Sequence, residues 1–208
     1  MKSKKKLYIA ALALLLLVVD QLIKFYIKLN FPYGGGFNLF GDADWAQILF
    51  IENNGMAFGL QLGGMAGKLI LSIFRLVLIS LLIWYINRLL NKKGVPIGVI
   101  IGFTLILVGA IGNIIDSAFY GLIFSESSYS EVAKLVSFGD GYAPFLCGKV
   151  VDMFYFPIIK GNIPDWVPFA GGNYFEFFRP IFNFADSCIT CGVIYMMLFQ
   201  RKFFLKKN

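Results

Sequence analysis

The chain has 208 residues, of which 58% are hydrophobic and only 15% are charged. Water-soluble domains are about 45–50% apolar and about 25% charged, so this composition excludes an ordinary soluble domain and predicts an integral membrane protein. The sequence contains no histidine, which excludes a Ser–His–Asp triad, a Cys–His pair and any zinc site with histidine ligands.

Four stretches are long and apolar enough to cross a bilayer, which takes about 20 mostly apolar residues. We predict membrane-spanning helices over residues 7–29, 69–87, 96–116 and 180–200. The first stretch follows four lysines, as a secretory signal would, but it runs on into Val18-Val19-Asp20-Gln21 without a small-residue cleavage site. We therefore expect it to be retained as the first span of a single membrane domain, residues 1–208.

Basic residues predict the orientation of these spans, because lysine and arginine near span ends stay on the cytoplasmic side. Eleven of the 19 basic residues, and none of the 12 acidic ones, lie in the first six residues, between residues 88 and 93, or after residue 200. Both termini are therefore expected in the cytoplasm, with segments 30–68 and 117–179 facing outward. The orientation of the spans accounts for the net charge of +7, so this charge gives no reason to expect nucleic-acid binding.

The two outward segments carry signs of short strands and loops. Ile48–Glu52 is typical of a short strand and precedes a turn at Asn53-Asn54-Gly55. Ser125–Ser130 is polar and indicates a loop. The aromatic runs at Phe154–Pro157 and Trp166–Phe178 are typical of a membrane–water interface.

Polar side chains within the spans are candidates for function, because a charge in lipid is expensive unless it faces a protein interior. Asp20 and Lys24 lie four residues apart on one face of the first span and are expected to pair. A structural pair is favoured over a direct role with a substrate. Asn113 and Asp116 lie at the outer end of the third span, where a merely polar helix end is the alternative.

Three further polar residues lie near the outer face. Asn183 and Asp186 follow Pro180, which we place in the first turn of the fourth helix, where proline is tolerated. The positive end of that helix dipole favours a carboxylate such as that of Asp186. Asp152 lies in an apolar setting within an outer loop, where a lone carboxylate must find a partner or keep its proton.

A pair of these acids would offer hydrolytic chemistry. Two carboxylates that share a site cannot both ionise easily, so one retains a proton and acts as an acid. The other can then remove a proton from a water molecule. In a chain without histidine this is the simplest hydrolytic apparatus, although spacing alone leaves open which acids meet.

Five short blocks follow one another along the chain: Asp20-Gln21-Leu22-Ile23-Lys24, Asn53-Asn54-Gly55-Met56-Ala57-Phe58-Gly59, Gly112-Asn113-Ile114-Ile115-Asp116, Val150-Val151-Asp152-Met153 and Phe182-Asn183-Phe184-Ala185-Asp186-Ser187. In this order and on four spans, they resemble the lipoprotein signal peptidases, or signal peptidase II, a family of bacterial inner-membrane aspartic proteases. The resemblance covers nearly the whole chain except residues 117–149 and 157–178.

The resemblance implies an all-α membrane protein with four transmembrane helices, a small outward-facing β-cradle and an interfacial amphipathic segment. It implies a dyad of Asp152 and Asp186 that cleaves diacylglyceryl-modified prolipoproteins just before the lipidated cysteine, at the outer face of the bacterial inner membrane. The resemblance implies neither a metal nor another cofactor. Membrane lipid is expected to surround the protein, and a monomer is expected to be functional. The residues that match positions lining or supporting such a site are Asp20, Lys24, Asn53, Gly55, Asn113, Asp116, Asn183 and Ala185.

Two departures and two alternatives accompany this interpretation. Family members usually carry arginine where this chain has Ser117, so we expect that guanidinium contact to be absent or supplied by Lys149 or Arg179. The outer segments are also longer than usual, and a neutral surface insertion is favoured over a role in substrate access.

An ion-coupled carrier using the intramembrane acids, or a scaffold subunit, would be the alternatives. The absence of repeated halves and the gathering of the acids at one face favour the peptidase.

Overall fold

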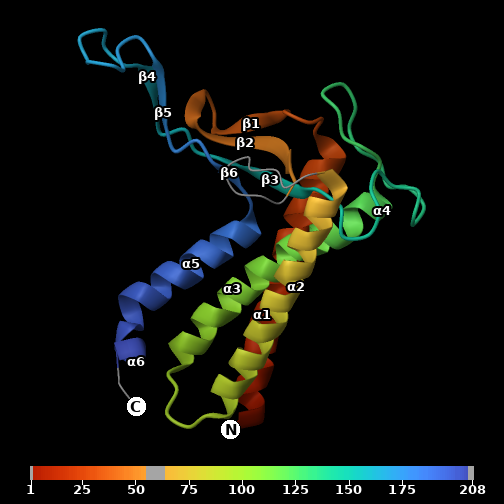
Figure 1. The fold of residues 1–208 in the computed structure, drawn as a ribbon, viewed down its shortest axis with the longest axis vertical. Helices are drawn as coiled ribbons and strands as arrows, with labels where there is room; N and C mark the ends of the chain where they lie inside the picture. The colour runs from red at the N-terminus through yellow and green to blue at the C-terminus, as the bar shows by residue number, and fades with distance from the viewer. Residues whose placement is uncertain (1, 55–63, 206–208) are drawn as a thin grey trace.

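A computed structural model describes residues 2–54 and 64–205 of the chain (Figure 1). In chain order, the helices are α1 (Lys2–Asn30), α2 (Gly64–Asn91), α3 (Ile97–Ile115), the π-helical turn η2 (Asp116–Tyr120), α4 (Gly121–Ile123), α5 (Phe184–Phe199) and α6 (Arg201–Leu205). The strands are β1 (Gly36–Phe40), β2 (Ala43–Asn53), β3 (Val150–Tyr155), β4 (Ile159–Asn162), β5 (Tyr174–Phe177) and β6 (Ile181–Phe182).

Three helical segments of the described chain are long and apolar enough to cross a membrane. They are α1, α2 and the continuous segment from α3 through η2 to α4, each with 27 or 28 residues in its apolar span. The fourth apolar helix, α5, has 16 residues. The first three predicted spans are therefore found as long apolar helices, whereas a fourth crossing by α5 stays a prediction.

The prediction that the fourth helix begins at Pro180 is wrong. Residues 181–182 form β6, which pairs antiparallel with β3. Asn183 keeps an extended backbone, with φ −118° and ψ −179°, and α5 begins only at Phe184. Because β6 gives its backbone groups to a sheet ladder, the helix cannot start before this strand ends.

An antiparallel sheet in the order β1-β2-β3-β6 lies at one end of the helices (Figure 1). The strand expected at Ile48–Glu52 is confirmed as part of β2. Asp152, in contrast, lies on β3 and not in a loop, because its segment pairs with both β2 and β6. The hairpin of β4 and β5 projects beyond this sheet (Figure 1).

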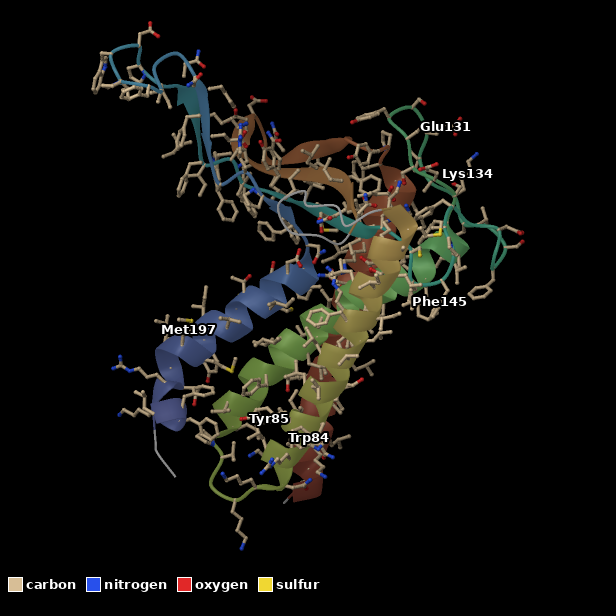
Figure 2. All side chains as sticks on the ribbon, in the orientation of Figure 1. Trp84, Tyr85, Glu131, Lys134, Phe145 and Met197 are labelled. Atoms are coloured by element: carbon tan, nitrogen blue, oxygen red, sulfur yellow. The ribbon has the colours of Figure 1, made fainter. Side chains whose placement is uncertain are left out.

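The basic segments of the chain share the end of the molecule opposite the sheet. The start of α1, the connection from α2 to α3, and α6 all lie there (Figure 1). Trp84 and Tyr85 of α2 lie towards this end, whereas Glu131 and Lys134 lie on the loop beside the sheet (Figure 2). The orientation of these two ends relative to the cytoplasm stays a prediction. The same holds for the interfacial amphipathic segment and for the single-domain organisation.

Glycine residues allow α3 and α5 to pack closely. A Cβ atom at Gly109 would lie 2.2 Å from the carbonyl oxygen of Ala185, and one at Gly192 would lie 2.8 Å from that of Gly102. Small residues of this kind let helix backbones approach one another in lipid, where no hydrophobic force drives helices together. The close approach sets the start of α5 against the last turns of α3.

A core of apolar side chains joins the helices to the sheet. It connects α1, β2, η2 and β3 and excludes water from the space between them. Its buried members are Ile27, Ile48, Phe50, Tyr120, Phe124, Val151 and Met153.

We predict that Gly109→Ala destabilises the protein by about 1–3 kcal/mol, despite the higher helix propensity of alanine, because the new methyl group overlaps α5. The measurement is the thermal unfolding midpoint of the purified protein in detergent. The matched control is Gly161→Ala on β4, where an added Cβ meets nothing within 4 Å. A Gly109→Ala midpoint as high as that of the wild type would contradict the packing.

Candidate active site

Polar side chains from five elements meet where α5 begins. They come from α1, the end of β2, the junction of α3 with η2, β3 and the first turn of α5. Gly55 lies outside the described residues. The other residues expected from the sequence are all found in this cluster: Asp20, Lys24, Asn53, Asn113, Asp116, Asp152, Asn183, Ala185 and Asp186.

Asp152 is a buried carboxylate, with only 3% of its surface exposed. Its Oδ1 accepts a hydrogen bond of 2.7 Å from the Nδ2 of Asn183. Its Oδ2 accepts one of 3.2 Å from the Nδ2 of Asn53, the last residue of β2. The pairing of β2 with β3 brings this amide to the carboxylate, because Asn53 is in register with Val150.

Asp186 lies in the first turn of α5 and is less buried than Asp152. Its Oδ1 accepts a hydrogen bond of 2.8 Å from the Nδ2 of Asn113, and its Oδ2 accepts one of 3.2 Å from the backbone N–H of Asn183. The Oδ1 of Asn183 in turn accepts the backbone N–H of Asp186 at 2.9 Å. This capping box holds the Asp186 side chain at the positive end of the helix.

Asn183 links the two carboxylates. Its Nδ2 donates to the Oδ1 of Asp152 and, at 3.0 Å, to the Oδ1 of Asn113. Both hydrogens of its amide are used by these two bonds. Asn183 therefore orients the acids rather than offering a donor to a bound molecule.

A buried lysine lies directly behind this pair. The Nζ of Lys24 is 3.1 Å from Asp20, 2.9 Å from Asp116 and 3.1 Å from the Oδ1 of Asn113. All three charged side chains are fully buried. The ion pair expected between Asp20 and Lys24 is thus present, and the structure adds Asp116 as a second anion.

Asp20 and Asp116 also bind the backbone beside each candidate acid. The Oδ1 of Asp20 accepts the N–H of Ala185 at 2.9 Å, and the Oδ2 of Asp116 accepts the N–H of Val151 at 3.2 Å. Ala185 directly precedes Asp186, and Val151 directly precedes Asp152. The lysine-centred cluster therefore fixes the backbone positions of both acids.

The environment makes the two carboxylates unequal. Burial first, and then the nearby charge of Asp186, raises the pKa of Asp152 from its ordinary value of 3.8 to about 7, although hydrogen bonds from Asn53 and Asn183 oppose the change. Asp186 is more accessible and lies at a helix N-terminus, which favours negative charge. One proton can therefore stay on the pair near neutral pH.

Gln21 and Arg75 belong to this region but were not named as site residues from the sequence, although Gln21 stands in the first of the five blocks. The Nε2 of Gln21 donates to Asp20 at 3.0 Å and to Asp116 at 3.1 Å. Arg75 of α2 interacts electrostatically with Asp186 and Asp152. The signal available for both was their position, because an amide or a guanidinium inside an apolar span requires a polar partner.

Of the two alternatives given for the missing arginine beside Asp116, replacement by Lys149 or Arg179 is not found, because both side chains pair elsewhere. Lys149 pairs with Glu52 and Glu126, both at 3.2 Å, and Arg179 lies 3.7 Å from Glu176. Lys24 is the cation that meets Asp116.

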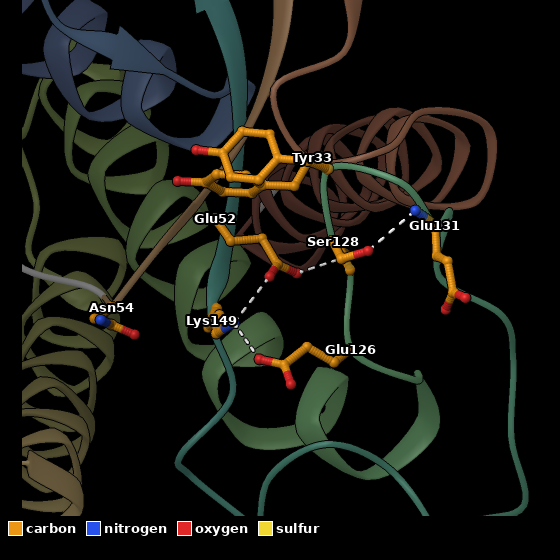
Figure 3. A pocket seen from close by; sticks show the side chains of 9 residues that line it. Tyr33, Glu52, Asn54, Glu126, Ser128, Glu131 and Lys149 are labelled. Atoms are coloured by element: carbon orange, nitrogen blue, oxygen red, sulfur yellow. Dashed lines mark hydrogen bonds and ion pairs between the residues drawn. The ribbon is translucent and has the colours of Figure 1, made fainter.

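A separate polar pocket of about 620 Å³ lies beside β2 (Figure 3). Neither Asp152 nor Asp186 is among the residues that line it. The buried Lys28 of α1 pairs with Glu52 at its wall, and Lys149 binds Glu52 and Glu126 (Figure 3). Because Glu52 precedes Asn53 and Lys149 precedes β3, these ion pairs tie both strands to α1. The residues lining the pocket are Tyr33, Glu52, Asn54, Glu126, Ser127, Ser128, Tyr129, Glu131 and Lys149.

Comparisons with known proteins agree on one family. Residues 12–202 match the family model described as signal peptidase (SPase) II. The chain is 48% identical to the lipoprotein signal peptidase of Porphyromonas gingivalis, over 91% of this chain and 81% of that protein. It is 35% identical to the lipoprotein signal peptidase of Amoebophilus asiaticus, over 96% of this chain and 80% of that protein.

The fold also resembles a solved structure, described as a bacterial membrane enzyme determined by the in meso method. The TM-score is 0.57, the sequence identity is 23%, and the match covers 97% of this chain and 94% of the other. At this identity the likeness supports the fold alone.

The raised pKa of Asp152 predicts a pH-dependent stability. The stability associated with this group is fully present below pH 3.8, falls as the pH rises through about 7, and then levels off. The fall amounts to at most about 1.4 kcal/mol per pH unit. We predict that Asp152→Asn lacks this fall, so that its advantage in thermal midpoint over the wild type grows between pH 4.5 and 7.

The comparison is made on purified protein in detergent. Asp140→Asn is the control, because Asp140 is exposed and away from the cluster, and it should follow the wild type at every pH. Parallel curves for Asp152→Asn and the wild type would show that Asp152 titrates normally.

Proposed function

The chain belongs to the signal peptidase II family, and on this premise we propose that it is an aspartic endopeptidase with Asp152 and Asp186 as its catalytic dyad. Membership of this family makes it a protease of lipoprotein processing and favours that function over an ion-coupled carrier. Its substrates, as we propose them, are diacylglyceryl-modified prolipoproteins, cut immediately before the lipidated cysteine.

The observation that carries the assignment is the shared hydrogen bonding of the two carboxylates. Asn183 contacts both of them, and each of their four oxygen atoms accepts a hydrogen bond from an asparagine. The acids are thus fixed in orientation, while only Asp152 is almost completely shielded from solvent. An orienting network around two unequal acids is what acid–base catalysis requires.

The unequal environments assign the roles. Ionised Asp186 removes a proton from a water molecule that attacks the scissile carbonyl carbon. Protonated Asp152 donates a hydrogen bond to the carbonyl oxygen, and a proton held by the dyad passes to the leaving amine as the C–N bond breaks. Proton transfers of this kind contribute about 10²–10⁴-fold to a rate.

The location of the dyad fits a lipid-anchored substrate. The dyad lies where the long apolar helices meet the sheet, so acyl chains can stay in the bilayer while the adjacent peptide bond reaches the acids (Figure 1). By the distribution of basic residues, the sheet end faces outward from the bacterial inner membrane and both termini lie in the cytoplasm. Every group of the proposed chemistry comes from one chain, which supports a functional monomer.

We predict that Asp152→Asn and Asp186→Asn each lower cleavage by about 10²–10⁴-fold or more, because each removes one partner in proton transfer. The measurement is the fraction of a lipid-modified prolipoprotein converted to shorter product by purified protein in detergent. Asp140→Asn, an exposed change of the same kind, should cleave at the wild-type rate. Near-normal cleavage by either dyad variant, with a normal thermal midpoint, would falsify the dyad.

A further inference from the structure

Arg75 is an arginine within α2, one of the long apolar helices. It lies about three turns from the start of α2, which begins at the sheet end of the molecule (Figure 1). Its side chain is half-buried. A charge at such a position is expensive unless it faces the protein interior and meets a partner of opposite charge.

The face of α2 that carries Arg75 is turned towards the segment that precedes β3. Ser72 donates its Oγ hydrogen to the carbonyl oxygen of Leu146 at 2.8 Å, and the Nζ of Lys68 donates to that of Cys147 at 3.1 Å. Arg75 follows these residues at intervals of three and seven positions, so it lies on the same face. The contacted residues lie a few positions before the start of β3, the strand of Asp152.

Both dyad acids act electrostatically on this guanidinium. Arg75 interacts electrostatically with Asp186 and, to a smaller extent, with Asp152. Among the described residues, the other charged groups around the dyad are Asp20 and Lys24 of α1 and Asp116 at the start of η2. The charge of Lys24 is already shared between two buried carboxylates, and its effect on Asp152 is smaller than that of the nearby charge of Asp186.

We propose that Arg75 is a positioning residue of the peptidase, whose permanent positive charge stabilises the dyad in its singly protonated, singly ionised form. The guanidinium cannot lose its proton in a protein, so it acts at any pH at which the enzyme works. It favours the ionised acid electrostatically and thereby widens the active range towards low pH. This inference rests on the proposed role of Asp152 and Asp186.

The test measures kcat/KM for cleavage of a lipid-modified prolipoprotein from pH 5 to pH 9. In Arg75→Gln the acidic limb of the profile should move upward by about one pH unit, with about tenfold slower cleavage on that limb. Arg75→Lys keeps the charge and should keep the limb near its wild-type position. Arg88→Gln, near the other end of α2, is the matched control and should leave the profile unchanged.

A uniform loss in Arg75→Gln at every pH, with the acidic limb unmoved, would overturn the proposal, because a structural or substrate-binding role has that effect. The same conclusion would follow if Arg75→Lys behaved like Arg75→Gln. The neutral side chain of Arg75→Gln suits an apolar helix, and the thermal midpoints of both variants verify that they fold. Failure of the proposed function is distinguishable, since Asp152→Asn would then still cleave the precursor.

Discussion

The geometry of the site depends on the ion pairs that the buried ammonium group of Lys24 forms with two carboxylates. This group holds Asp20 and Asp116 together without exposure to water, and these carboxylates bind the backbone N–H groups of Ala185 and Val151. Those two residues directly precede Asp186 and Asp152, the acids of the proposed dyad. A buried ion cluster of this kind adds little to net stability, but removal of one member leaves a costly unpaired charge. Its consequence here is a defined position for two acids that are distant in sequence.

The membrane setting explains why the site takes this form. Glycine residues let α5 lie close enough to α3 for the amide of Asn113 to reach Asp186. The pairing of β2 with β3 brings Asn53 to Asp152 from the other side. The same polar cluster therefore closes the helix bundle and aligns the acids at the junction with the sheet, where the proposed function requires a peptide bond next to a lipid anchor.

The sequence predicted the members of the site better than the elements that carry them. The described residues that were predicted from the five blocks all lie in one cluster. The blocks can be recognised from residue type and order alone, without knowledge of the fold. Asp152 was expected in a loop and Pro180 in a helix, since β3 pairs with strands about 100 and about 30 residues away, and such pairing leaves little local signal. Arg75 and Gln21 were not recognised as site residues, because their roles depend on which faces of α1 and α2 turn inward.

The most direct test of this account is the single-turnover rate of prolipoprotein cleavage by Lys24→Met, measured at saturating substrate and at a temperature where the variant is folded. Misplacement of catalytic groups by about 1 Å can cost about 10²-fold, so the account predicts a loss of at least that size. Lys4→Met, an exposed change on the same helix, should retain the full rate. A folded Lys24→Met that cleaves at nearly the wild-type rate would contradict the claim that the buried lysine positions the dyad.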